Sequence, residues 1–205
     1  MIPLRDVIPS RTFPFFTIAL IAINAAAWFY ELSLDEDRLI AFLGAWGVVP
    51  ARFESSTLIS SMFLHGSWSH VIGNMLYLWI FGDNVEDRMG HGRFLVFYLL
   101  AGIAAAYGQM AINPDSTLPL IGASGAIAGV MGAYLVLYPH SRVLTVVTLL
   151  FFWEVVEVPA IFLLGFWFVA QLFSAGAIAA TASSEGGVAF MAHVAGFLVG
   201  VVGVF

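Results

Sequence analysis

The chain has no cysteine and no lysine, and only 10% of its 205 residues are charged. The absence of cysteine excludes disulfide bonds and thiolate metal sites. The net charge of −6 argues against a nucleic acid as partner, because nucleic-acid-binding domains carry clustered basic residues. The chain is instead strongly apolar: 61% of its residues are hydrophobic, against roughly 45–50% in soluble domains. This composition predicts an integral protein of the lipid bilayer.

Six apolar segments divide the sequence, each bounded by charge, proline or glycine. They lie near residues 13–30, 66–82, 94–112, 122–139, 159–176 and 188–205. A helix needs about 20 apolar residues to cross a bilayer, so we expect an all-α membrane protein with six transmembrane helices in one domain, residues 1–205. The first segment could also be read as a removable signal with a cleavage site at residues 25–27, but its length favours a retained span.

Two further stretches do not fit a span. The connection 31–65 mixes acidic residues with short apolar pieces, which is typical of a loop that lies partly in the membrane interface. Segment 143–158 is apolar, but Glu154 and Glu157 interrupt it. Too few residues follow for it to form a second crossing beside the fifth span. We expect this segment to lie on the inner side and to dip into the interface.

The arginines predict an orientation, because positive charge near the ends of spans is retained in the cytoplasm. An inner N-terminus places five arginines inside and two outside. The inner ones are Arg5, Arg11, Arg88, Arg93 and Arg142, and the outer ones are Arg38 and Arg52. Six spans then put both termini in the cytoplasm, and spans two, four and six all run from outside to inside.

Few polar side chains interrupt the spans, and each is a functional hypothesis because polar groups in a membrane are costly. His70 and Asn74 are four residues apart and share one helical face. Ser124 opens the fourth span, and His193 lies in the sixth. In the predicted topology Ser124 and His193 fall within roughly 10 Å of the outer boundary, at ~1.5 Å per residue. We interpret these polar residues, which share one depth, as a single site.

Glycines at helical spacing accompany both Ser124 and His193. They are Gly125 and Gly129 in the fourth span, and Gly196 and Gly200 in the sixth. Small residues at this spacing let membrane helices approach closely, as a hydrogen bond between Ser124 and His193 requires. At this point packing alone could also explain the glycines and the serine, and His70 and Asn74 could be hydrogen-bonding contacts between helices.

Serine is a weak nucleophile unless a base takes its proton, and His193 is a base within reach. An acyl-transfer site also needs donors for the developing oxyanion. His70 and Asn74 offer two side-chain donors, and the backbone N–H of Ser124, at a helix N-terminus, offers a third. We therefore predict a Ser–His dyad with no metal and no cofactor.

A carboxylate that would complete a triad is missing from these motifs. The nearest candidates along the sequence, Asp115 and Glu185, lie in predicted loops. Glu86 is expected to tie down the turn after the second span with Arg88 or Arg93. This absence favours a dyad over a triad.

Taken together, the motifs resemble the rhomboid family of intramembrane serine proteases. They are GASG at 122–125, HVIGN at 70–74, AHVAGFLVG at 192–200, FLHG at 63–66, NMLYLWIFGDNVEDRMG at 74–90 and the Pro–Ala pair at 159–160. The resemblance covers nearly the whole chain, in the order the family shows.

The resemblance implies a six-helix bundle with Ser124 as nucleophile and His193 as general base. It implies oxyanion stabilisation by His70 and Asn74, with Gly122 shaping the loop before the serine. The fifth span, about 159–176, and the following loop 177–190, with Ser183, Ser184, Gly186 and Gly187, would form a mobile lateral gate. Expected substrates are transmembrane segments that unwind at small residues, in a bacterial inner membrane. The oligomeric state is not indicated.

The chain departs from the better-known family pattern at two places. Ser56–Thr57 stands where many members carry Trp–Arg in the first outer loop, and Ala128 stands where some carry an aromatic that stacks on the catalytic histidine. What orients His193 is therefore unexplained.

Two other functions stay open. One is a small transporter with a relay of His65, His70, His193 and Glu154, although no inverted repeat supports it. The other is a non-catalytic chaperone that binds membrane helices.

Overall fold

The structure is a computed structural model that describes residues 1–149, 152–181 and 189–204. It is mostly helical, and each of the six apolar segments overlaps one helix. These helices are α1 (Phe15–Glu31), α4 (Trp68–Met89), α5 (His91–Ile112), α6 (Ser124–Leu137), α7 (Ala160–Thr181) and α8 (Phe190–Gly203). Among the described residues, α5 and the part of α7 over Ala160–Ala177 are long and apolar enough to cross a membrane, and α1, α6 and α8 are shorter apolar helices.

Local sequence signals define the helix ends that matter for the site. The side chain of Ser67 accepts a hydrogen bond from the backbone N–H of His70, which caps α4 and places His70 in its first turn. Gly90, with a φ of 82°, ends α4 and leads directly into α5. Ser124 is the first residue of α6.

The connection between α1 and α4 consists largely of short helices that the sequence reasoning did not predict. They are α2 (Glu36–Trp46), η1 (Pro50–Arg52), α3 (Thr57–Ser60) and η2 (Ser61–Phe63). The side chain of Asp35 caps α2 by accepting from the backbone N–H of Arg38. None of the residues of α2 is buried, so this helix lies on the outside of the bundle.

Local hydrogen bonds hold this connection around Ser56–Thr57, the place where the resemblance implies a Trp–Arg pair in many members. The hydroxyl of Thr57 donates to the backbone carbonyl of Glu54 at 2.7 Å. The hydroxyl of Ser60 donates to the carbonyl of Trp46, also at 2.7 Å, and so links α3 to the end of α2. Short serine and threonine side chains thus anchor the loop through its own backbone.

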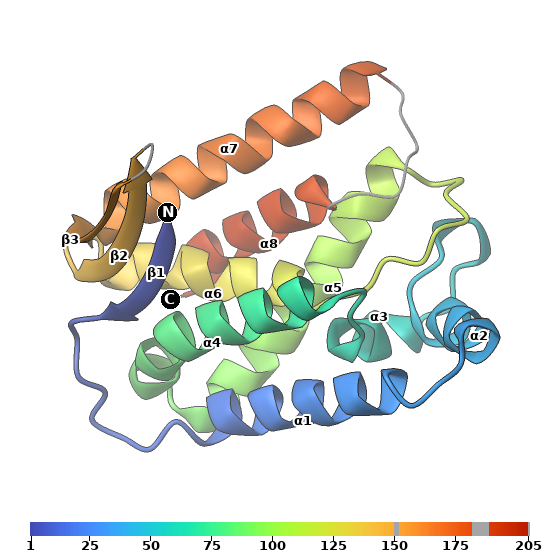
Figure 1. Cartoon of the computed structure of the whole chain (residues 1–205), viewed down its shortest axis with the longest axis horizontal. Helices are drawn as coiled ribbons and strands as arrows, with labels where there is room; N and C mark the ends of the chain where they lie inside the picture. The colour runs from blue at the N-terminus through green and yellow to red at the C-terminus, as the bar shows by residue number, and fades with distance from the viewer. Residues whose placement is uncertain (150–151, 182–188, 205) are drawn as a thin grey trace.

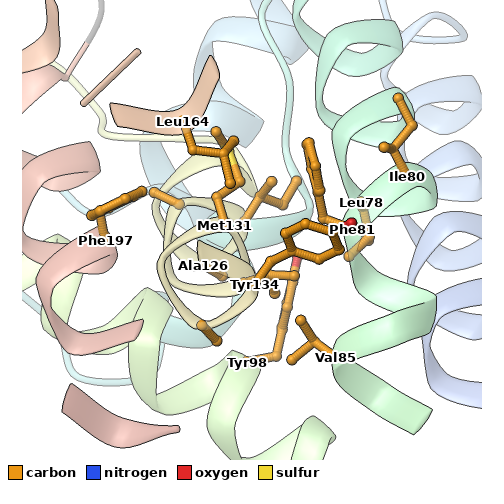
Figure 2. Packing of buried hydrophobic residues seen from close by; sticks show 14 of the residues in the cluster. Leu78, Ile80, Phe81, Val85, Tyr98, Ala126, Met131, Tyr134, Leu164 and Phe197 are labelled. Atoms are coloured by element: carbon orange, nitrogen blue, oxygen red, sulfur yellow. The ribbon is translucent and has the colours of Figure 1, made fainter. Parts of the chain in front are cut away.

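Helix α6 lies at the centre of the bundle, against α4, α5 and α8, while α1 and α7 lie at opposite edges (Figure 1). Every residue from Gly125 to Tyr134 is buried. The ring centroids of Phe81 on α4 and Tyr134 on α6 are 4.9 Å apart. Figure 2 shows these two side chains beside each other. Lipid tails are as apolar as these side chains, so close packing rather than exclusion of water holds such helices together.

Glycines permit the close contact between α6 and α8. A Cβ on Gly196 would collide with the backbone carbonyl of Gly125, and a Cβ on Gly200 would collide with that of Gly129. On the side of α6 that faces α5, a Cβ on Gly125 or Gly129 would lie 2.5 Å from an alanine Cβ. No larger residue fits this interface without separating the helices.

The prediction of an all-α chain was wrong at one end of the bundle, where three strands form an antiparallel sheet. They are β1 (Ile2–Asp6), β2 (Arg142–Leu149) and β3 (Phe152–Pro159), in the order β1-β2-β3. Segment 143–158, expected to dip into the interface, is thus mostly a β-hairpin. Its repeated valines and threonines are the signal that could have revealed it, because β-branched residues favour strands.

Asp6 connects this sheet to the helices. Its Oδ2 accepts a hydrogen bond from the hydroxyl of Tyr134 at 2.6 Å and another from the side-chain amide of Asn84 at 2.9 Å. Burial raises the pKa of the Asp6 carboxyl, and the hydrogen bond from Tyr134 partly offsets this effect. Strand β1 is therefore joined to both α4 and α6.

Glu86 does not pair with Arg88 or Arg93, which corrects the prediction from the sequence. Its fully buried carboxylate accepts hydrogen bonds from the backbone N–H groups of Phe16 and Thr17, from the hydroxyl of Thr17 and from Nδ1 of His91. The first N–H groups of a helix lack partners within it. Glu86 therefore caps the N-terminus of α1 from the neighbouring helix α4.

Candidate active site

The structure brings Ser124 and His193 together, although 69 residues separate them in the sequence. Ser124 Oγ lies 2.8 Å from His193 Nε2. Ser124 begins α6, and His193 lies in the first turn of α8. The close approach of these two helices at their glycines places both side chains within hydrogen-bonding distance. His193 is 8% exposed.

A cavity of about 720 Å³ adjoins this pair. His70 and Asn74 line it together with Ser124 and His193, so four of the predicted site residues meet at one space. Its wall also includes Tyr77, Ile127, Met131 and Trp167. The cavity thus combines a few polar groups with a mostly apolar wall, as is typical of ligand sites.

The loop before α6 passes directly against His70 at Gly122. This glycine has a φ of 116°, and a Cβ there would lie 2.6 Å from Nε2 of His70. Its N–H donates to the backbone carbonyl of Ser61 at 2.8 Å, which fixes the loop to η2. Both the backbone conformation and the close approach require glycine at this position.

His65 does not line the cavity but forms a hydrogen bond with the side chain of Asn74, a contact that the sequence did not predict. Its Nε2 lies 3.0 Å from Nδ2 of Asn74, and its side chain is almost fully buried. The backbone N–H of His65 in turn donates to the carboxylate of Glu31 at the end of α1. The orientation of Asn74 therefore depends on residues from the loop and from α1.

Gln171 is a residue of the site that the sequence analysis did not name. Its Oε1 lies 2.8 Å from Nδ1 of His193, on the opposite side of the ring from Ser124. Trp167, one turn earlier on α7, has its ring centroid 5.7 Å from that of His193. An amide in an otherwise apolar helix was the available signal, because such groups are rare in spans and usually find a partner.

Other predicted candidates lie elsewhere. Glu154 is exposed on β3 and does not line the cavity, so the relay considered for a transporter is not assembled. Asp115 lies in the loop after α5. Glu185 and the predicted gate residues Ser183, Ser184, Gly186 and Gly187 lie outside the described residues. Within the described part of the chain, no three His, Asp or Glu side chains gather in a way that could hold a metal.

Comparison with known proteins agrees with the motifs. The sequence model of the Rhomboid domain matches residues 52–205. The chain belongs to the rhomboid family. This confirms the resemblance seen in the sequence and makes the chain, with its several apolar helices, a rhomboid-family membrane protein.

Three relatives illustrate the similarity. Over 126 residues the chain is 36% identical to the rhomboid protease GluP of Bacillus subtilis (strain 168), a match that covers 60% of this chain and 24% of that protein. It is 31% identical over 133 residues to rhomboid protein 1, mitochondrial, of Saccharomyces cerevisiae, covering 62% and 37% of the two chains. It is 29% identical over 118 residues to the rhomboid protease GlpG of Klebsiella pneumoniae, covering 57% and 41%. The matched region is thus less than half of each of these three relatives.

Proposed function

We propose that this protein is an intramembrane serine endopeptidase that hydrolyses peptide bonds in or near transmembrane segments of membrane proteins. The observation that carries the proposal is the 2.8 Å contact between Ser124 Oγ and His193 Nε2 beside a cavity. A base at hydrogen-bonding distance is what a serine hydroxyl needs to become a nucleophile. Membership of a family whose relatives include proteases supports the same function.

In the proposed reaction, Ser124 Oγ attacks the carbonyl carbon of the scissile bond while Nε2 of His193 takes the hydroxyl proton. The C–N bond then breaks as His193 gives this proton to the leaving nitrogen, and the acyl group stays on Ser124 as an ester. A water molecule, deprotonated by His193, hydrolyses the ester and restores the serine. The cavity is the route by which this water reaches the site.

The negative charge that develops on the carbonyl oxygen needs preorganised donors. His70 and Asn74 supply side-chain donors from the face of α4 that lines the cavity. The backbone N–H of Ser124 supplies a further donor at the N-terminus of α6, where the helix dipole also favours negative charge. Gly122 shapes the loop that brings the N-terminus of α6 beside His70.

The substrate class follows from the setting of the site. A peptide bond inside a helix is shielded by the hydrogen bonds of that helix, so the substrate must unwind locally before Ser124 can reach it. We propose transmembrane segments with small residues as substrates, a bacterial inner membrane as location, and six spans with both termini in the cytoplasm.

The test is cleavage of a labelled transmembrane substrate by the purified chain in liposomes. Ser124→Ala and His193→Ala are each expected to lower the rate by more than about a thousandfold, because nucleophile and base act as a unit. Ser33→Ala, an exposed serine after α1, is the matched control and should cleave like the parent. If both site variants cleave as fast as the parent, the proposed function is wrong.

A further inference from the structure

The imidazole of His193 has partners on both of its nitrogens. Nε2 lies 2.8 Å from Ser124 Oγ, and Nδ1 lies 2.8 Å from Oε1 of Gln171. An amide oxygen only accepts hydrogen bonds, so Nδ1 must carry the ring proton in this contact. The lone pair is then on Nε2, where it can receive the proton of Ser124. The contact with Gln171 thus selects the tautomer that a general base needs.

Gln171 and Trp167 approach His193 from the same face of α7, one helical turn apart. Neighbouring residues such as Phe166, Leu172 and Phe173 point away from the bundle and are exposed. A side-chain amide among them would be costly in lipid without a partner. Gln171 therefore lies on the inward face because its amide finds a hydrogen-bonding partner there, the ring of His193.

No residue of α6 takes over this role. The residue one turn after Ser124 is Ala128, which has no ring to stack on the imidazole and no hydrogen-bonding group. The orientation of the base is thus left to the side chains of α7 and to Phe190, whose ring centroid lies 6.4 Å from that of His193. Among the described side chains of this group, only Gln171 bonds to a ring nitrogen.

We propose that Gln171 is a positioning residue for His193: its side-chain oxygen fixes the tautomer and the ring orientation that Ser124 needs. Because Gln171 belongs to α7, the base is aligned only while α7 lies against α8. This inference rests on the proposed function of the Ser124–His193 pair. It gives the dyad a third, neutral member in the place that a carboxylate occupies in a Ser–His–Asp triad.

A neutral partner has a chemical consequence that can be measured. A carboxylate in this place would stabilise the imidazolium, whereas an amide fixes the ring without adding charge. Three groups contact the ring of His193 from neighbouring helices: Ser124 from α6, and Trp167 and Gln171 from α7. Phe190 lies beside the ring on the same helix, and His70 of α4 lies across the cavity. The amide of Gln109 from α5 bonds to the backbone of Ala192. The described residues place no carboxylate in contact with the ring.

The experiment compares kcat, KM and the pH–rate profile of the parent with those of Gln171→Leu and Gln171→Glu in liposomes. Gln171→Leu keeps the approximate size but removes the acceptor, so kcat should fall about tenfold or more with little change in KM. Gln171→Glu presents an oxygen in either orientation, so it should retain most of the activity. Its acid limb should move to higher pH because the carboxylate stabilises the imidazolium.

Gln109→Leu is the matched control. Gln109 also contacts α8, where it accepts from the backbone N–H of Ala192 at 3.3 Å, but it does not touch the ring of His193. Its removal should leave the pH profile of the parent unchanged.

The outcomes separate this inference from the proposed function. A parent that does not cleave contradicts both. An active parent matched within twofold by Gln171→Leu contradicts only the role of Gln171. If Gln171→Leu does not fold, Gln171→Glu decides: an acid limb at the parent position contradicts the contact with Nδ1, and a shifted limb supports it.

Discussion

At the residue scale, Gly122 carries the most demanding local geometry of the site. Its φ of 116° is unfavourable for any residue with a Cβ, and that Cβ would lie 2.6 Å from Nε2 of His70. A substitution there would have to move either the loop that leads into α6 or the ring of His70. Both movements alter the positions of the proposed oxyanion donors relative to Ser124.

Gly122→Ala is therefore expected to lower kcat at least tenfold and to destabilise the fold by about 1–2 kcal/mol, the usual cost of a left-handed conformation. Substrate cleavage and thermal unfolding in detergent measure the two effects. Gly92→Ala is the control, because Gly92 lies in the first turn of α5 and its added Cβ would meet no atom of another element within 4 Å. A Gly122→Ala variant that cleaves like Gly92→Ala would contradict this role of the loop.

The sequence was informative about residues whose chemistry stands out in an apolar chain. Ser124, His70, Asn74 and His193 were recognisable because polar groups are rare in the spans. Gln171 was missed, and His65 was considered only for a transporter relay and not as a partner of Asn74, because both contacts depend on how separate elements face each other. Facing relations between helices follow from helix rotation and packing, which spacing within one segment does not determine.

At the element scale, the contact between α6 and α8 determines whether the site exists at all. Gly125 and Gly129 on one helix face Gly196 and Gly200 on the other, with backbone against backbone. The helices gain van der Waals contact at this distance that larger residues would prevent. The same closeness brings Ser124 within 2.8 Å of His193.

Gly196→Val is expected to abolish cleavage, because its side chain would meet the backbone carbonyl of Gly125 and force the helices apart. Such overpacking typically lowers the free energy of unfolding by about 1–3 kcal/mol, so a fraction of the molecules should still fold. Cleavage and the thermal midpoint in detergent are measured together, with Gly165→Ala on α7 as control, since a Cβ there meets nothing within 4 Å. If Gly196→Val still cleaves although its thermal midpoint is lowered, then close contact between α6 and α8 is not required for cleavage, and this prediction is wrong.

Long apolar segments predicted the six main helices, whereas the sheet was missed although the β-branched residues of segment 143–158 favour strands. The six apolar segments were long enough to suggest helices, and each overlaps one in the structure. Segment 143–158 was predicted to be one apolar run interrupted by Glu154 and Glu157, whereas the structure divides this part of the chain between two strands of eight residues each. The partner strand β1 lies at the other end of the sequence, and no local pattern reveals such a pairing.

At the scale of the whole molecule, the structure gathers both termini at one end of the bundle (Figure 1). Strand β1 pairs with β2, which places the N-terminal residues beside the connection from α6 to α7. At the C-terminal end of α8, a Cβ on Gly203 would lie 3.6 Å from the ring of Phe97 near the start of α5. The same end carries five of the seven arginines, which lie on β1, before α1, at the turn from α4 to α5 and at the start of β2.

This arrangement predicts that reporters fused before Met1 and after Phe205 will both appear in the cytoplasm, while one inserted at Asp115, in the loop between α5 and α6, will appear outside. The physical reason is that the arginine-rich end resists translocation. A fluorescent protein that folds only in the cytoplasm and a phosphatase that is active only outside it give opposite signals at each position. If the two termini lie on opposite sides of the membrane, the number of spans is odd, or strand β1 does not pair with β2 at the end where α8 finishes. If both termini lie outside the cytoplasm, His193 lies near the inner face, which would contradict the prediction that Ser124 and His193 lie near the outer boundary of the membrane.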